Sequence, residues 1–255
     1  MAWIPAETTF HPEEHSNGVI GIATQLNHHD SGLHLHNMGQ LLFSQQGCMR
    51  VTINSSMCIL PPTRVAWIPA QVVHRVQIRG HVSYRSIYLN EQYLSPFSDE
   101  VEVLSTTPLL RELLERVALA HFRTDWSSGA HANILAVFMD ELSNAKREIS
   151  FLPFPQDRRL RCLKEIEPPP LLQVLASYSG ASEKTISRIM NRETGVSYQQ
   201  WRQQWRLFKA IELLSSQHSL TDVASKLEFA STSAFITFFR NMTGESPRLY
   251  MAMLK

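Results

Sequence analysis

Residues 219–250 read SLTDVASKLEFASTSAFITFFRNMTGESPRLY, and this stretch decides how the C-terminal part of the chain folds. Apolar residues recur at helical spacing on both sides of a turn at Phe229-Ala230. We expect Thr221 to cap the first helix and Ser231 the second, because hydroxyl oxygens accept hydrogen bonds from the N–H groups of a first helical turn. Gly244, with a proline shortly after it, predicts the end of the second helix. The stretch therefore predicts two short helices joined by a turn.

The second of these helices has an outward face that suits contact with DNA. Phe235 and Phe239 lie four residues apart and are expected to pack inward together. Recognition helices present short polar side chains to base edges and a basic group to guanine or phosphate. An ordinary helical hairpin with a solvated face would show the same pattern. The outward residues are Thr232, Ser233, Thr237, Arg240 and Asn241.

A second copy of the pattern lies upstream and favours DNA binding. Pro170 suits a first helical turn, Gly180 is expected to form a turn, and Ser182 is expected to cap the helix that follows. Between the two copies, residues 198–214 predict a helix of about 25 Å, which holds two reader helices about one DNA turn apart. The outward residues of the upstream reader are Lys184, Thr185, Ser187, Arg188 and Asn191.

These residues resemble the AraC/XylS family of bacterial transcription regulators. The resemblance runs from about Leu171 to Tyr250 and rests on the tail pattern of residues 231–250, SxSxFxxxFxxxxGxxPxxY. It implies an all-α domain with two helix-turn-helix motifs that binds double-stranded promoter DNA. It also implies a homodimer, and RNA polymerase as a partner if the protein is an activator. One departure is Glu167-Pro-Pro-Pro170, which stands where family members usually have a longer lead-in.

Charge and composition agree with this division. Residues 157–255 carry 14 Lys and Arg against nine Asp and Glu, whereas residues 1–156 carry ten against 14. A basic C-terminal part suits phosphate contact. No apolar run is long enough to cross a membrane, and the chain lacks the basic start and apolar core of a secretory signal. We therefore expect a cytoplasmic protein without a membrane partner.

The first hundred residues indicate a different fold. Short apolar or alternating runs recur, and Gly, Pro and Asn-Ser clusters separate them. Such spacing predicts a small antiparallel β-barrel or jelly roll. Two amphipathic helices are expected next, at 107–121 and 130–149, where they either pack on the barrel or pair two subunits. The fold class is therefore α+β, with a barrel at 1–100, linker or dimerisation helices at 101–156 and the DNA-binding domain at 157–255.

The histidines of the barrel resemble the two cupin motifs. His34 and His36 share one face of a strand, Gln40 stands where a Glu commonly binds metal, and His74 closes a Pro-x-x-x-x-His pattern in which Gln71 replaces a glycine. The resemblance implies that His34, His36, Gln40 and His74 converge inside the barrel. Such donors suit Zn²⁺, Ni²⁺, Fe²⁺ or Mn²⁺. A metal-free pocket for an organic effector is the alternative.

Other residues of the barrel are candidates for an effector pocket or for plain core, namely Phe43, Met49, Trp67 and Tyr84. The favoured function is a sequence-specific DNA-binding transcription regulator, not an enzyme, whose cupin-like domain senses a small molecule or a metal. Within the AraC-type group, the stretch from His34 to Gln40 together with residues 65–69 is most similar to the NimR-type branch. Two alternatives stay open: a cupin metalloenzyme fused to a DNA-binding tail, and a constitutive DNA-binding protein with a scaffold barrel.

Overall fold

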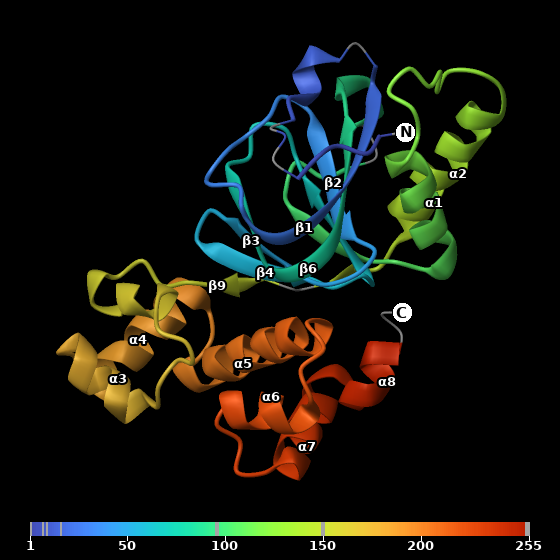
Figure 1. Ribbon diagram of the computed structural model, residues 1–255. Helices are drawn as coiled ribbons and strands as arrows, with labels where there is room; N and C mark the ends of the chain where they lie inside the picture. The colour runs from blue at the N-terminus through green and yellow to red at the C-terminus, as the bar shows by residue number, and fades with distance from the viewer. Residues whose placement is uncertain are drawn as a thin grey trace. The chain divides into compact units, whose positions relative to one another are not determined.

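The computed structural model describes residues 2–6, 8, 10–15, 17–94, 97–148 and 151–252. The chain divides into two compact units. The first holds the described residues up to 51 and those between 60 and 148, and the second holds 52–59 and 151–252. Figure 1 shows the strands of the first unit and the helices of the second.

The first unit is a curled antiparallel sheet, which confirms the predicted fold class for this part of the chain (Figure 1). Its strands follow the order β8-β7-β5-β2-β6-β3, and β1 also pairs with β6. The strands are β1 (Val19–Asp30), β2 (Gly39–Ser44), β3 (Met49–Ile53), β5 (Arg64–Ile68), β6 (His74–Leu89), β7 (Glu102–Ser105) and β8 (Arg147–Glu148). Short 3₁₀ turns flank the sheet at η1 (Pro12–Glu14) and η2 (Glu91–Tyr93).

Two helices cover one face of this sheet, α1 (Pro108–Ala118) and α2 (Gly129–Asn144). Both begin close to the predicted residues but end earlier than predicted, and Ile149 lies outside the described residues. Arg85 on β6 donates two hydrogen bonds of 2.9 Å to the Glu115 carboxylate on α1. The shared core includes Leu41, Phe43, Trp67, Ile87, Leu110, Leu114 and Phe138.

The opposite face of the sheet is partly polar. Since side chains alternate between the faces of a strand, residues one position away from the helix-covered core point the other way. Gln40 and Tyr88 are paired across β2 and β6 and are both buried there, and Ser86 lies on the same face. This polar face of the sheet carries the candidate histidine site.

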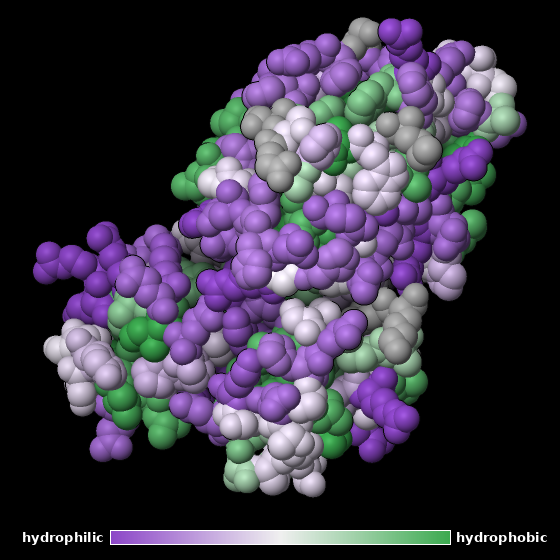
Figure 2. Space-filling view, viewed as in Figure 1, coloured by the Kyte–Doolittle hydropathy of each residue, from purple (hydrophilic) through white to green (hydrophobic). Residues whose placement is uncertain are grey.

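The second unit is mainly helical, with a short antiparallel pairing of β4 (Ser56–Leu60) and β9 (Leu152–Pro153). Figure 2 shows hydrophilic and apolar side chains mixed over its surface. In the part of the chain that the structure describes, none of the helices has the length and apolar character needed to cross a membrane. The helices are η3 (Arg158–Lys164), α3 (Leu172–Ser179), α4 (Glu183–Thr194), α5 (Tyr198–Ser215), α6 (Leu220–Lys226), α7 (Thr232–Thr243) and α8 (Pro247–Ala252).

Candidate functional site

The second helix-turn-helix motif, here called the second reader, consists of helices α6 and α7. Ser231 caps α7 by accepting a hydrogen bond from the Ala234 N–H, and Gly244 ends the helix with a φ of +83°, as predicted. The predicted cap of α6 was wrong, because Ser219 and not Thr221 accepts the bond from the Asp222 N–H at 3.1 Å. α6 therefore begins two residues earlier than predicted.

The polar residues predicted for the second reader lie on the accessible side of α7. Phe235 and Phe239 are fully buried, and their ring centres are 5.9 Å apart. Ser233, Thr237, Arg240 and Asn241 are exposed, whereas Thr232 is half-buried. The structure therefore brings the five predicted side chains to one helix and leaves four of them open to a partner.

The first reader, α3 and α4, has the same design. Gly180 takes a φ of +62° between the helices, and Ser182 caps α4 through the Thr185 N–H. Pro170 was placed wrongly in the first turn of α3, since that helix begins at Leu172. Buried Ile186, Ile189 and Met190 hold α4 inward. Of the predicted reader residues, Lys184, Arg188 and Asn191 are exposed, and Thr185 and Ser187 are half-buried.

The helix α5 joins the two readers, as predicted. Ser197 and Gln200 form a capping box at its start, in which each side chain bonds the backbone of the other residue. Trp201, Trp205 and Phe208 are buried along it. Its 18 residues span about 27 Å at about 1.5 Å per residue, which approaches the length of one DNA turn.

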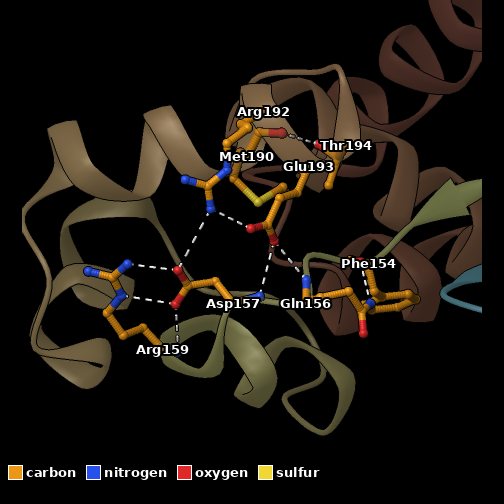
Figure 3. Close-up of polar contacts among 8 residues, drawn as sticks. All are labelled: Phe154, Gln156, Asp157, Arg159, Met190, Arg192, Glu193 and Thr194. Carbon is orange, nitrogen blue, oxygen red and sulfur yellow. Dashed lines mark hydrogen bonds and ion pairs between the residues drawn. The ribbon is translucent and has the colours of Figure 1, made fainter.

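The C-terminal end of α4 is tied to the segment that precedes η3 (Figure 3). The Glu193 carboxylate accepts hydrogen bonds from the backbone N–H groups of Gln156, at 2.8 Å, and Asp157, at 3.0 Å. The hydrogen bond from Arg192 lowers the pKa of Glu193. Hydrogen bonds from Arg159 likewise hold the pKa of the Asp157 carboxyl well below its usual range. Sequence reasoning missed this contact, because its partners are distant in the chain.

The structure brings the three predicted histidines together on the polar face of the first unit. His34 and His74 form an antiparallel bridge, with backbone hydrogen bonds of 3.0 and 2.9 Å. The ring centres lie 4.3 Å apart for His34 and His74, 5.1 Å for His36 and His74, and 6.3 Å for His34 and His36. His36 and His74 are buried and His34 is half-buried. Gln71 takes a φ of +66°, a conformation that glycine favours.

All three rings use Nδ1 in the same way. Each Nδ1 faces a backbone carbonyl oxygen: Gly32 for His34 at 3.2 Å, Met38 for His36 at 2.6 Å, and Val72 for His74 at 2.9 Å. Because a carbonyl only accepts, Nδ1 carries the hydrogen, and in a neutral ring of His34 or His74 Nε2 keeps a lone pair. His36 differs, because its Nε2 faces the Gln40 amide oxygen at 3.0 Å, which also only accepts. Burial lowers the pKa of His36, and lowers that of His74 to about 4.

Gln40 connects this cluster to the neighbouring strands. Its amide nitrogen donates to the Ser86 and Tyr88 hydroxyls at 2.8 and 3.2 Å, and its amide oxygen lies 3.0 Å from His36 Nε2. His74 Nε2 is buried and has no hydrogen-bond partner among the residues that the structure describes. Burial also raises the pKa of Tyr88 to about 12, so the Tyr88 hydroxyl beside Gln40 stays neutral.

The donor atoms of this cluster suit a transition metal, but the side chains are not yet arranged around one point. A tetrahedral ion at about 2.1 Å from three Nε2 atoms sets ring centres roughly 5 Å apart, similar to the separations here. Ligating histidines also donate their other ring N–H to carbonyls, as these do. Within the described ranges, no three His, Cys, Asp or Glu side chains already stand in position to hold an ion. Binding therefore requires the rings to turn toward one point.

The four residues predicted for an effector pocket do not line one cavity. Phe43 and Trp67 are buried in the core against α1 and α2. Tyr84 packs instead against the cluster of Tyr88 and Met38 on the polar face. Met49 is fully buried. The reason is strand alternation: Tyr84 pairs with Ser44, the residue after Phe43, so the Phe43 and Tyr84 side chains point to opposite faces.

Comparison with known proteins covers both units. The family model for the AraC-like ligand binding domain matches residues 16–136, and a model for a helix-turn-helix domain matches residues 175–253. The HTH-type transcriptional regulator NimR of Escherichia coli strain K12 is 27% identical over 252 residues, which span 96% of this chain and 92% of NimR. The HTH-type transcriptional regulator RipA of Corynebacterium glutamicum is 30% identical over 103 residues, 38% of this chain and 31% of RipA.

Two solved structures are also similar. The DNA-binding domain of AdpA, in complex with a target DNA, is 30% identical, covering 36% of this chain and 84% of that chain with a TM-score of 0.33. Wild-type ToxT from Vibrio cholerae with unsaturated fatty acid bound is 12% identical, covering 91% of this chain and 94% of that chain with a TM-score of 0.37.

Proposed function

The chain belongs to the AraC family of DNA-binding transcription regulators, and we propose that α4 and α7 read two successive major-groove segments of one promoter. The observation that carries this proposal is that two capped helices, joined by α5, each leave a polar and basic face exposed. Like NimR, which it matches over 92% of NimR's length, it is a transcription regulator and not an enzyme.

Each reader offers one arginine for base or phosphate contact, Arg188 on α4 and Arg240 on α7. Both side chains are exposed. A guanidinium can hold the two acceptors of a guanine edge or a phosphate. Shorter polar side chains lie nearer the helix starts, where recognition helices approach the bases: Thr185 about one turn before Arg188, and Ser233 about two turns before Arg240.

Selection of DNA from a random library by the purified full-length protein tests this proposal. Footprinting of the selected sites should protect two segments about one turn apart. Arg188→Ala and Arg240→Ala should each weaken binding by about 1–3 kcal/mol if they contact bases, with loss of protection at one segment each. Arg147→Ala, an exposed arginine of the first unit, is the matched control. If neither variant changes affinity or footprint, the placement of the readers is wrong.

We further propose that the first unit binds the effector at the polar face of its sheet. The family model for ligand binding covers this unit, and the Nε2 lone pairs of neutral His34 and His74 rings can coordinate a metal or accept a hydrogen bond. Effector binding would shift the population between two states of the regulator that differ in promoter affinity.

A divalent transition metal is the effector or cofactor that these donors suit best. His34, His36 and His74 would hold it through Nε2, with the Gln40 amide oxygen as a fourth donor, and the ion would supply a Lewis-acidic, positively charged centre. Elemental analysis of the wild type beside His34→Ala/His74→Ala is the test. One ion per chain that is lost in the double variant supports the site. No ion in the Zn²⁺-loaded wild type refutes it and leaves an organic effector.

The remaining parts of the proposal concern assembly and place. We propose a homodimer formed through α1 and α2, because Leu109 and Val137 on these helices are exposed. Leu109→Glu with Val137→Glu should then give monomers in light scattering, and an unchanged mass would refute this pairing. The protein would act in the cytoplasm, where promoter DNA lies, and would contact RNA polymerase if it activates.

A further inference from the structure

Three cations on one face of α5 connect the two readers. Arg202, Arg206 and Lys209 stand at positions i, i+4 and i+7 and therefore point to the same side of the helix. Arg202 is buried, and the other two are half-buried. Charges withdrawn from water require partners. Apart from Glu212 on α5 itself, which lies 2.8 Å from the Lys209 ammonium, the partners come from two segments that flank different readers.

The first of these segments is the proline run that leads into α3. Arg202 Nε donates to the Pro169 carbonyl oxygen at 2.6 Å, and the Tyr198 hydroxyl donates to the Pro170 carbonyl oxygen at 2.7 Å. Prolines carry no N–H group, so this run can be fixed by hydrogen bonds only through donors that reach its carbonyls. α5 supplies these donors and thereby holds the entry of the first reader.

The second segment is the turn between α6 and α7. Arg206 donates to the Leu227 carbonyl oxygen at 2.6 Å, and its guanidinium lies 3.7 Å from the ring centre of Phe229. The other end of the Arg202 guanidinium lies 3.3 Å from the Glu228 carboxylate. One side chain, Arg202, therefore contacts both the lead-in of the first reader and the turn of the second.

Apolar packing does not fill this junction. An open cleft of ≈ 220 Å³ lies among the lead-in, α5 and the end of α6, lined by residues that include Pro168, Trp205 and Leu227. At its edge the Lys209 ammonium lies 3.1 Å from the Glu167 carboxylate. Since apolar contact is interrupted at this open cleft, the directed polar contacts beside it contribute to the relative position of the surrounding elements.

We propose that Arg202 is a positioning residue that sets the distance and angle between the two reader helices. It thereby determines which separation of half-sites on DNA the protein accepts. Arg202 does this without touching DNA, because its guanidinium is buried between the Pro169 carbonyl and the Glu228 carboxylate. The inference rests on the proposed function, since spacing matters only if both readers engage one duplex.

The test is a spacing series on DNA selected by the wild-type protein. One to five base pairs are inserted between the two footprinted segments, five being about half a helical turn. The wild type should lose about tenfold or more in affinity at the worst spacing, because a rigid pair of readers cannot follow the second segment around the helix. Arg202→Ala should shrink the ratio between best and worst spacing by about threefold or more.

Other variants separate positioning from folding. Arg202→Lys keeps a buried cation but loses the planar fork that reaches two partners, so it should give an intermediate ratio even if Arg202→Ala does not fold. Phe208→Leu lowers the stability of α5 through its apolar core and should leave the ratio unchanged. The proposal is overturned if folded Arg202 variants weaken binding equally at every spacing. A wild type that selects no DNA would instead overturn the proposed function.

Discussion

Removal of the Ser219 hydroxyl tests where the second reader begins. Its Oγ accepts from the Asp222 N–H at 3.1 Å and bonds the Asp222 carboxylate at 2.6 Å. α6 has only seven residues, so this cap is a large share of the bonds that hold it. Replacing an N-cap serine by alanine costs about 1 kcal/mol. Ser219→Ala should therefore cost about 1 kcal/mol, whereas Thr221→Ala should stay within about 0.5 kcal/mol, as surface substitutions do.

Urea denaturation of the full chain, followed by circular dichroism, measures both variants. The hydrogen bond from Ser219 lowers the pKa of Asp222. A carboxyl with a depressed folded-state pKa stabilises the fold above its unfolded pKa, near 3.9, and loses this contribution as pH falls through the folded value. The gap between wild type and Ser219→Ala should therefore narrow below about pH 4. The reverse ranking, with Thr221→Ala the costlier change, would refute the assigned cap.

Three further predictions concern the remaining contacts. Glu193→Ala should destabilise the helical unit by about 1–2 kcal/mol in denaturant titration, because two backbone N–H groups lose a charged acceptor; Glu193→Gln, which keeps an oxygen there, should cost less. Gly39→Ala should cost about 1–3 kcal/mol or prevent folding, since the new Cβ would lie 2.1 Å from the Trp67 ring, and an unchanged melting temperature would contradict this. Gln71→Gly should change stability by less than about 1 kcal/mol, because relief of its positive φ offsets the extra freedom of the unfolded chain, and a large loss of stability would show that the side chain matters instead.

Local chemistry explains why the reader helices were predictable. Ser182 and Ser231 cap their helices and Gly180 ends α3 as expected, because each of these roles depends on a few neighbouring residues. The error at α6 is also local. Ser219 is followed three residues later by Asp222, which can return a bond to the cap, whereas Thr221 is followed by Ala224. This reciprocal pattern would have identified the correct cap.

In the first unit, the pairing between strands was the part of the fold that the sequence could not predict. The alternation of side chains showed which residues of one strand share a face, but the relation between strands depends on register. Phe43 and Tyr84 were both predicted as candidates for one effector pocket, but the pairing of Tyr84 with Ser44 puts their side chains on opposite faces. The histidines came together despite this limit, because the bridge between His34 and His74 joins the two motifs directly.

The relative position of the two readers could not be predicted from single segments of the sequence. On an isolated helix, Arg202, Arg206 and Lys209 look like a solvated basic face, as such spacing usually is. Arg202 is buried because carbonyl oxygens of the proline run and a carboxylate of the α6–α7 turn reach it from two sides. Neither partner lies within one helical turn of it in sequence. The proline run itself was visible as a departure from the family pattern. Because its prolines offer carbonyl oxygens but no N–H groups, it gives a physical reason why α5 carries Arg202 and Tyr198 as donors.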